Sequence, residues 1–226
     1  MSEIRATYSG LIIFLTGLIT LVSITVSTLI ITRTLSQEEY GTWGLILSLF
    51  AYGTIVSSFV NFWGVRDTAR GKEIGKTSIF SNSIFSIVGV IIFLIISLIV
   101  TTQLSLNINL FIAAAILVPI IIIYRTIVSI NLGWKPQLVS YGNLISGISY
   151  IPFVIVFVYF LELSIYGIII AISLQHITNI IFLTVFSHQK FREKINFKIF
   201  RRWIKFSWVP TYPKLSNMVY SVDIMI

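Results

Sequence analysis

Five long stretches of this chain contain no charged residue, and their lengths constrain the fold more than any other feature. An uncharged apolar stretch of about 20 residues is enough for one helix to cross the hydrocarbon core of a bilayer. The longest stretch is interrupted by the polar segment TTQLSLNIN at 101–109, which we interpret as a break between two helices. The sequence therefore predicts an all-α, polytopic transmembrane helix bundle. The uncharged stretches are 6–32, 40–65, 77–124, 136–161 and 163–189.

Composition supports a membrane-embedded chain. Hydrophobic residues make up 56% of the positions and charged residues only 11%, whereas about 25% is usual in a soluble domain. The first apolar stretch is too long for a signal-peptide core, so we interpret it as a retained anchor. With no cysteine in the chain, disulfides and thiolate metal sites are excluded. We expect six helices near 10–32, 40–62, 78–100, 109–130, 140–161 and 165–187, and the start of a seventh near 207.

The net charge of +8 is distributed unevenly between the two sets of connectors. Connectors on the other side of the membrane contain one basic residue, Arg33. Since basic residues collect on the cytoplasmic side, we place the N-terminus and the 188–206 segment there. Basic segments beside membrane helices favour contact with anionic lipids, so we expect membrane lipids and no nucleic acid as partners. The basic set is Arg5, Arg66, Arg70, Lys72, Lys76, Arg125, Lys135, Lys190, Arg192, Lys194, Lys198, Arg201, Arg202 and Lys205.

The chain divides into a six-helix lobe at 1–187, a basic segment at 188–206 and the truncated start of a second lobe at 207–226. The basic segment mixes aromatic residues with its cations. Two interpretations stay open for it: an amphipathic helix on the cytoplasmic surface, or a basic flank before the next membrane helix. The last segment has no polar flank after its apolar residues, so we expect the chain to be the N-terminal part of a longer protein.

Catalytic and cofactor patterns are missing from the sequence. GKEIGKT at 71–77 has three residues between its glycines, where a phosphate-binding loop requires four. No carboxylates are spaced for acid–base chemistry, and His176 and His188 have no metal-ligand pattern. We therefore predict a protein that is not an enzyme, with no catalytic residue, no metal and no cofactor.

Small and polar residues recur on one face of several predicted helices. Such stripes allow membrane helices to pack closely, and their presence on several helices also favours a shared polar interior. The expected contact of the first two helices would use the stripe that begins at Gly41. The stripes are Ser9, Thr16, Thr20, Ser23 and Ser27; Gly41, Gly44, Ser48 and Ala51; Asn82, Ser86 and Gly89; and Ser140, Asn143, Gly147 and Tyr150.

Two groups of polar residues lie deep in predicted helices. Gln175 and Asn179 share a face near the middle of the sixth helix, where polar side chains are costly and face a bundle interior or water. They are interpreted either as contacts between helices or as substrate contacts. Arg125 either extends to the membrane interface or faces a cavity, where it would bind an anionic headgroup. Pro119 is expected to kink the helix before Arg125.

Residues 33–70, RTLSQEEYGTWGLILSLFAYGTIVSSFVNFWGVRDTAR, resemble the N-terminal region of the polysaccharide-biosynthesis flippases, the O-antigen type included. These flippases belong to the multidrug/oligosaccharidyl-lipid/polysaccharide exporter superfamily. The basic segment and the following KFSWVPTYPKLSN resemble the family's entry into its seventh helix. Within the first stretch, Ser36 and Glu39 also have the spacing of a helix-capping box. The matching elements are Arg33, Leu35, Glu38-Glu39, Tyr40-Gly41, Gly64 and Arg66-Asp67-Thr68-Ala69-Arg70.

The resemblance implies one lobe of a two-lobe, multi-pass transporter of the cell membrane. Such proteins move polyprenyl-(pyro)phosphate-linked oligosaccharides across the bilayer by alternating access, and the partner would be the second lobe of the same protein. The alternatives are a multidrug or metabolite exporter of the same superfamily, a membrane-embedded glycosyltransferase or polymerase, and a scaffold. The candidate substrate-binding residues are Arg33, Arg66, Arg125, Asn143, Gln175 and Asn179.

Overall fold

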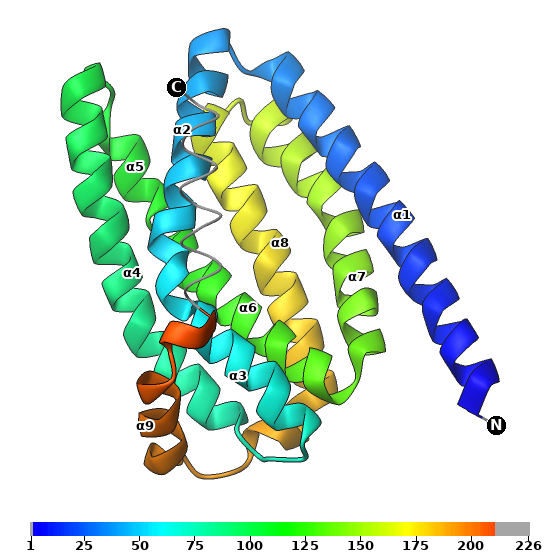
Figure 1. Ribbon diagram of the computed structural model, residues 1–226. Helices are drawn as coiled ribbons and strands as arrows, with labels where there is room; N and C mark the ends of the chain where they lie inside the picture. Colours follow the sequence, from blue (N-terminus) through cyan, green and yellow to red (C-terminus); the bar gives the residue numbers. More distant parts are fainter. Residues whose placement is uncertain (1, 211–226) are drawn as a thin grey trace.

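The computed structural model describes residues 2–210, with only the backbone described for residues 2–9. Throughout this range the chain is helical and contains no strand (Figure 1). Six helical segments are long and apolar enough to cross a membrane, which confirms the predicted fold class. The expected start of a second lobe lies mostly at 211–226, outside the described residues. The six segments are Gly10–Thr34, Gln37–Ala69, Gly75–Leu104, Ile108–Trp134, Pro136–Phe160 and Ser164–Phe191.

The helices run up and down between two ends of the bundle (Figure 1). We call one the α9 end, because the short helix α9 lies there with the α3–α4 and α6–α7 connectors, and we call the other the opposite end. The elements are α1 (Ser2–Thr34), α2 (Gln37–Thr54), α3 (Ser58–Ala69), α4 (Gly75–Leu104), α5 (Ile108–Ala114), α6 (Leu117–Trp134), α7 (Pro136–Val154), α8 (Ser164–Ser187) and α9 (Phe197–Lys205).

The second span is longer than the predicted helix at 40–62. A short 3₁₀ turn, Ile55–Ser57, joins α2 to α3, and the Thr54 hydroxyl donates to the Phe50 carbonyl just before it. Such hydroxyl bonds to the preceding turn tend to bend helices. Because α3 continues to Ala69, Arg66 lies in a helix and not in the connector where the sequence placed it.

The fourth span is broken, and Pro119 explains where. Proline has no N–H to donate, and its ring clashes with the carbonyl four residues earlier, which here belongs to Ala115. The Ala115 carbonyl instead accepts a 3.1 Å hydrogen bond from the Val118 N–H, as in a 3₁₀ turn. The helix therefore stops at Ala114 and restarts at Leu117, a full break where the sequence predicted a kink. The polar break before this span is also shorter than 101–109, because α4 continues to Leu104.

At the opposite end, the capping box predicted from the sequence is present. The Ser36 hydroxyl accepts from the Glu39 N–H, and the Glu39 carboxylate accepts from the Ser36 N–H at 2.9 Å. Ser164, at the start of α8, also donates its hydroxyl to Glu39 over 2.5 Å. This carboxylate therefore ties α2 to α8 across the bundle. Between α7 and α8 the chain forms a π-helical segment, Ile155–Phe160.

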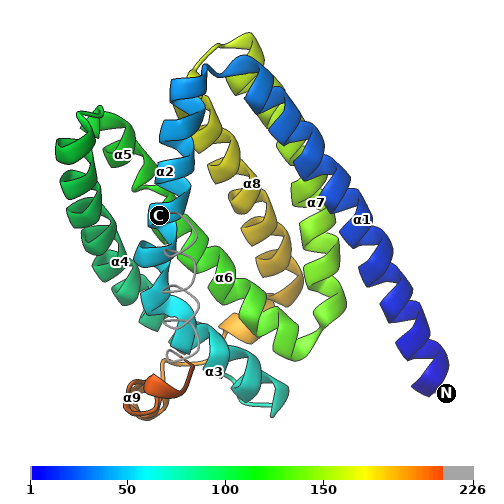
Figure 2. The same ribbon diagram turned by 45° about the horizontal axis from the view of Figure 1, so that its top comes forward.

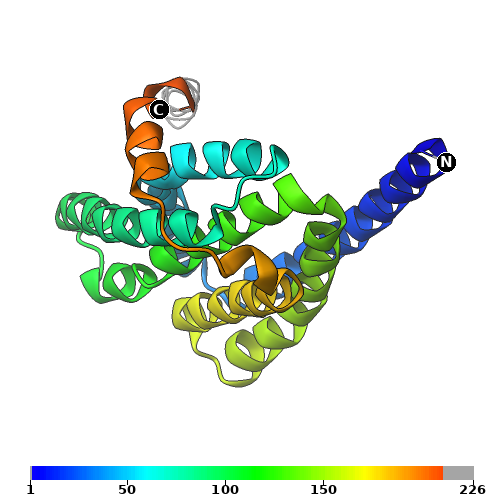
Figure 3. The same cartoon turned by 90° about the horizontal axis from the view of Figure 1, so that it is seen from below.

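Packing divides the helices into a tight group and one peripheral member. Figures 2 and 3 show that the N-terminal part of α1 diverges from the other helices. The contacts of α1 are mainly with α7, whereas α6 touches α3, α4, α7 and α8. The α1 stripe forms the α7 contact: Thr16, Ser23 and Ser27 are buried, and Thr20 lies beside Gly147.

The small-residue stripes of α2 and α4 behave differently from each other. Gly89 of α4 is buried against the backbone of Gly53, so α2 and α4 approach closely there. In the α2 stripe that begins at Gly41, Gly41, Gly44 and Ala51 are exposed and Ser48 is half-buried, and no other helix comes within 4 Å of the Cβ positions of Gly41 or Gly44. The expectation that it packs against the first helix is therefore wrong within the described residues.

Candidate functional site

Arg125 lies on the wall of a hollow between α3 and α6. Its guanidinium donates a 3.1 Å hydrogen bond to the hydroxyl of Thr54, which lies near the middle of the second span. The hollow has a volume of about 510 Å³, and Ser58, Asn61 and Ser129 are among its lining residues. The Ser58 hydroxyl is buried, and the Ser129 hydroxyl donates to the Thr126 carbonyl of its own helix. Arg125 thus faces the hollow near mid-span, which corresponds to the cavity alternative from the sequence.

The charge of Arg125 has no counter-ion among residues 10–210, whose side chains the structure describes. The ion pairs in this range involve Lys72 and Arg202, both with Asp67, and Arg125 forms none. A cation at the centre of a membrane helix costs roughly 2.5–3.5 kcal/mol on insertion scales. One neutral hydroxyl offsets little of that cost, so an anion entering the hollow would find an unpaired, bidentate donor.

Asn143 and Asn179 meet in the interior between α7 and α8. The Asn179 side-chain amide donates to the Asn143 oxygen and to the Ser146 hydroxyl, both at 3.1 Å. Tyr124, the residue before Arg125, donates its hydroxyl to the same Asn143 oxygen at 3.2 Å. This shared oxygen joins α6, α7 and α8 and connects the asparagine pair with the helix that carries Arg125.

The asparagine pair has little room around it. A Cβ at Gly142 would come within 2.5 Å of the Asn179 side-chain oxygen, so only glycine allows this approach. That oxygen is buried and has no partner among the described residues. His176 stacks on the Tyr124 ring with a 4.6 Å centroid distance, which extends the polar interior toward α8.

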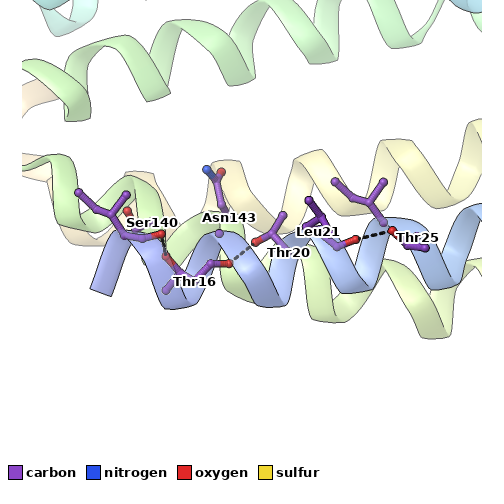
Figure 4. Close-up of a pocket in the computed structure, with 9 residues that line it drawn as sticks. Thr16, Thr20, Leu21, Thr25, Ser140 and Asn143 are labelled. Carbon is purple, nitrogen blue, oxygen red and sulfur yellow. Dashed lines mark hydrogen bonds between the residues drawn. The ribbon is translucent and has the colours of Figure 1, made fainter. Parts of the chain in front are cut away.

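A second hollow of about 450 Å³ lies between α1 and α7 (Figure 4). Thr16 and Thr20 of α1 and Ser140 and Asn143 of α7 are among its lining residues. The Thr16 and Thr20 hydroxyls bond to their own helix backbone. Asn143 therefore lines this hollow and also bonds inward to Asn179, whereas Arg125 lines the other hollow.

The remaining candidates lie elsewhere. Arg33 is exposed at the opposite end, in a hollow of about 650 Å³ that also includes Glu39 and Glu162. Arg66 is exposed on α3, with its guanidinium 5.7 Å from the centroid of the Trp63 ring. Gln175 is half-buried in α8 and makes no side-chain hydrogen bond with the residues described at 10–210. The six candidates therefore occupy several places and do not form one site.

A buried polar cluster lies beside the Arg125 hollow; the sequence placed Asn82 in a polar stripe but did not single out its partners Asn61 and Thr126. The Asn82 amide donates to the Asn61 oxygen at 2.9 Å and to the Thr126 hydroxyl at 2.6 Å. The Asn82 oxygen is buried without a partner among the described residues. Asn61 also lines the hollow. Asn61 is a polar residue within the long uncharged stretch 40–65, just as Asn143 is within 136–161. This pattern is the sequence signal that could have identified Asn61.

Comparisons with known proteins identify the fold. No family model matches the sequence, and no curated protein matches it. One similar solved structure is an outward-facing multidrug resistance transporter of the MATE family and MOP superfamily, with a TM-score of 0.65 and 15% identity over 93% of this chain and 52% of the other. Another, a MATE protein in a bent conformation, has a TM-score of 0.59 and 17% identity over 96% and 55%. This chain spans about half the length of both, and its fold is that of half a MATE-like transporter.

Proposed function

We propose that this multi-pass membrane protein is one lobe of a flippase for polyprenyl-(pyro)phosphate-linked oligosaccharides. The second lobe would belong to the same protein, and the two would rock about the substrate by alternating access. In this proposal the protein lies in the cell membrane with its α9 end in the cytoplasm, as the distribution of basic residues favours.

The unpaired charge of Arg125 carries the proposal. A substrate phosphate would supply the counter-ion that Arg125 lacks among residues 10–210, and a guanidinium binds phosphate through two parallel hydrogen bonds. The half-buried Asn61 lines the same hollow, and an amide side chain suits a phosphate or sugar hydroxyls. The polyprenyl tail would remain in the bilayer.

A second candidate function is the export of drugs or metabolites, and the fold comparison favours it. One similar structure is described as a multidrug resistance transporter. An exporter of cationic drugs requires a cavity that tolerates positive charge, and an unpaired arginine on the wall of the hollow opposes such a substrate.

Transport in proteoliposomes distinguishes the two functions. The full-length protein is reconstituted and offered a fluorescent lipid-linked oligosaccharide in one experiment and a fluorescent cationic drug in another. We expect transbilayer movement of the lipid and no accumulation of the drug. Drug accumulation without lipid movement would replace the flippase proposal with the exporter function.

A further inference from the structure

The segment before and within α9 is attached to the bundle by specific contacts. The Glu193 carboxylate accepts a 2.7 Å hydrogen bond from the Lys76 N–H, and the Asn196 N–H donates to the Thr77 hydroxyl at 2.9 Å. Gly75 lies directly against the carbonyl of Lys190, where a side chain would not fit. These contacts hold the segment on the first turn of α4, at the end of a membrane span.

Asp67 fixes α9 itself. Its carboxylate is 1% exposed and accepts hydrogen bonds from Arg202, from the Trp203 indole at 3.0 Å and from Lys72 at 2.9 Å. Trp203 is fully buried with Phe59, Val60 and Ile74. One face of α9 therefore packs against the bundle, and these contacts fix which residues of α9 face outward.

These contacts direct a mixed basic and apolar face of α9 away from the bundle. Lys198, Arg201 and Lys205 are exposed, and none of them forms an ion pair with the side chains described at 10–210. Ile204, 45% exposed, lies on this outward side, and Phe197 lies at its edge: the Phe197 ring meets Phe80 of α4 at a 5.8 Å centroid distance and is still 58% exposed. A helix with cations beside exposed apolar side chains is suited to the boundary between headgroups and acyl chains.

We propose that this outward face of α9, formed by Phe197, Lys198, Arg201, Ile204 and Lys205, binds anionic phospholipid headgroups of the leaflet at the α9 end. The three unpaired cations complement phosphate charge. The six membrane spans keep α9 near the membrane surface, because it packs on the ends of α3 and α4. This site is separate from the Arg125 hollow and does not depend on the transported substrate.

Hydrogen exchange and native mass spectrometry of the full chain in lipid nanodiscs test this proposal. In phosphatidylcholine discs containing phosphatidylglycerol, we expect α9 amides to exchange several-fold more slowly than in phosphatidylcholine alone. The K198Q/R201Q/K205Q variant should lose this difference. Mass spectrometry should show retained phosphatidylglycerol falling by roughly fivefold for each cation removed.

Two control variants distinguish lipid binding at α9 from a general attraction between the basic protein and an anionic membrane. R70Q/K135Q/R192Q removes the same charge from exposed residues near the α9 end and should retain the lipid-dependent protection. K198R/K205R keeps the charge of α9 and should also retain it. The proposal is overturned if wild-type α9 exchanges equally in both discs, if either control loses the protection, or if nucleic acid or acidic protein is retained on α9 in place of lipid.

Discussion

Replacing Asp67 by asparagine should release α9 from the bundle. The substitution preserves size but removes the charge that Lys72, Arg202 and Trp203 share. The two cations are 37% and 40% exposed, so water replaces much of what they lose and each contact contributes at most about 1 kcal/mol. The buried indole bond weakens by a similar amount when its acceptor becomes neutral. Lys72 lies in the α3–α4 connector and stays beside Asp67 when α9 opens, so only the Arg202 and Trp203 contacts enter the opening equilibrium. Together they contribute about 2 kcal/mol, which corresponds to roughly thirtyfold in the opening equilibrium of α9.

Amide hydrogen exchange of α9 in detergent or nanodiscs measures that opening. Glu73→Gln is a matched control, because Glu73 is an exposed carboxylate in the neighbouring connector with no hydrogen bond or ion pair within the described range. We expect roughly thirtyfold faster exchange near Trp203 in Asp67→Asn, and wild-type exchange in Glu73→Gln. Equal exchange in the two variants would refute the inference that Asp67 holds α9.

Three further substitutions test the packing of the bundle. Gly89→Ala should lower the thermal unfolding temperature in detergent, because its Cβ would meet the backbone of Gly53; overpacking typically costs about 1–3 kcal/mol. Gly44→Ala, in open space within α2, should not lower the temperature, because alanine favours a helix over glycine by up to about 1 kcal/mol. Asn143→Ala removes an acceptor shared by two donors and should destabilise the protein by about 1 kcal/mol in chemical denaturation, whereas an unchanged midpoint would contradict the shared hydrogen bonds. Ser36→Ala should cost about 1 kcal/mol and speed amide exchange in the first turn of α2; unchanged exchange would contradict the capping box.

The existence of the six spans could be predicted from the sequence, but their ends could not. Long uncharged stretches show which residues must avoid water, and this can be determined from each stretch without knowledge of its neighbours in the fold. A helix ends where its backbone hydrogen bonds stop, and charged residues do not stop it. Hence α3 continues through Arg66 and Asp67 to Ala69. Pro119 marked the region of the break in the fourth span, and the clash with the Ala115 carbonyl placed the break upstream of the proline.

Some residues of the candidate site could be singled out from the sequence, but Asn61 and Thr54 could not, and neither could the arrangement. Asn143 and Asn179 stood out as polar groups deep in apolar helices, yet nothing local indicates that they bond to each other. The contact of Asp67 with Trp203 joins positions 136 residues apart. Periodicity shows which residues share a face, and it does not show which neighbour covers that face. For this reason the stripe at Gly41 was assigned to a contact that the structure does not contain.

Transbilayer movement by Arg125 variants tests the central claim most directly. The full-length protein and its Arg125→Ala and Arg125→Lys variants are reconstituted, and the outward movement of a lipid-linked oligosaccharide is measured. If Arg125 binds the substrate phosphate, Arg125→Ala should move the lipid about tenfold to a hundredfold more slowly. Arg125→Lys should recover part of the rate, because it keeps the charge without the bidentate geometry. Wild-type rates in a folded Arg125→Ala protein would contradict the proposed role of Arg125.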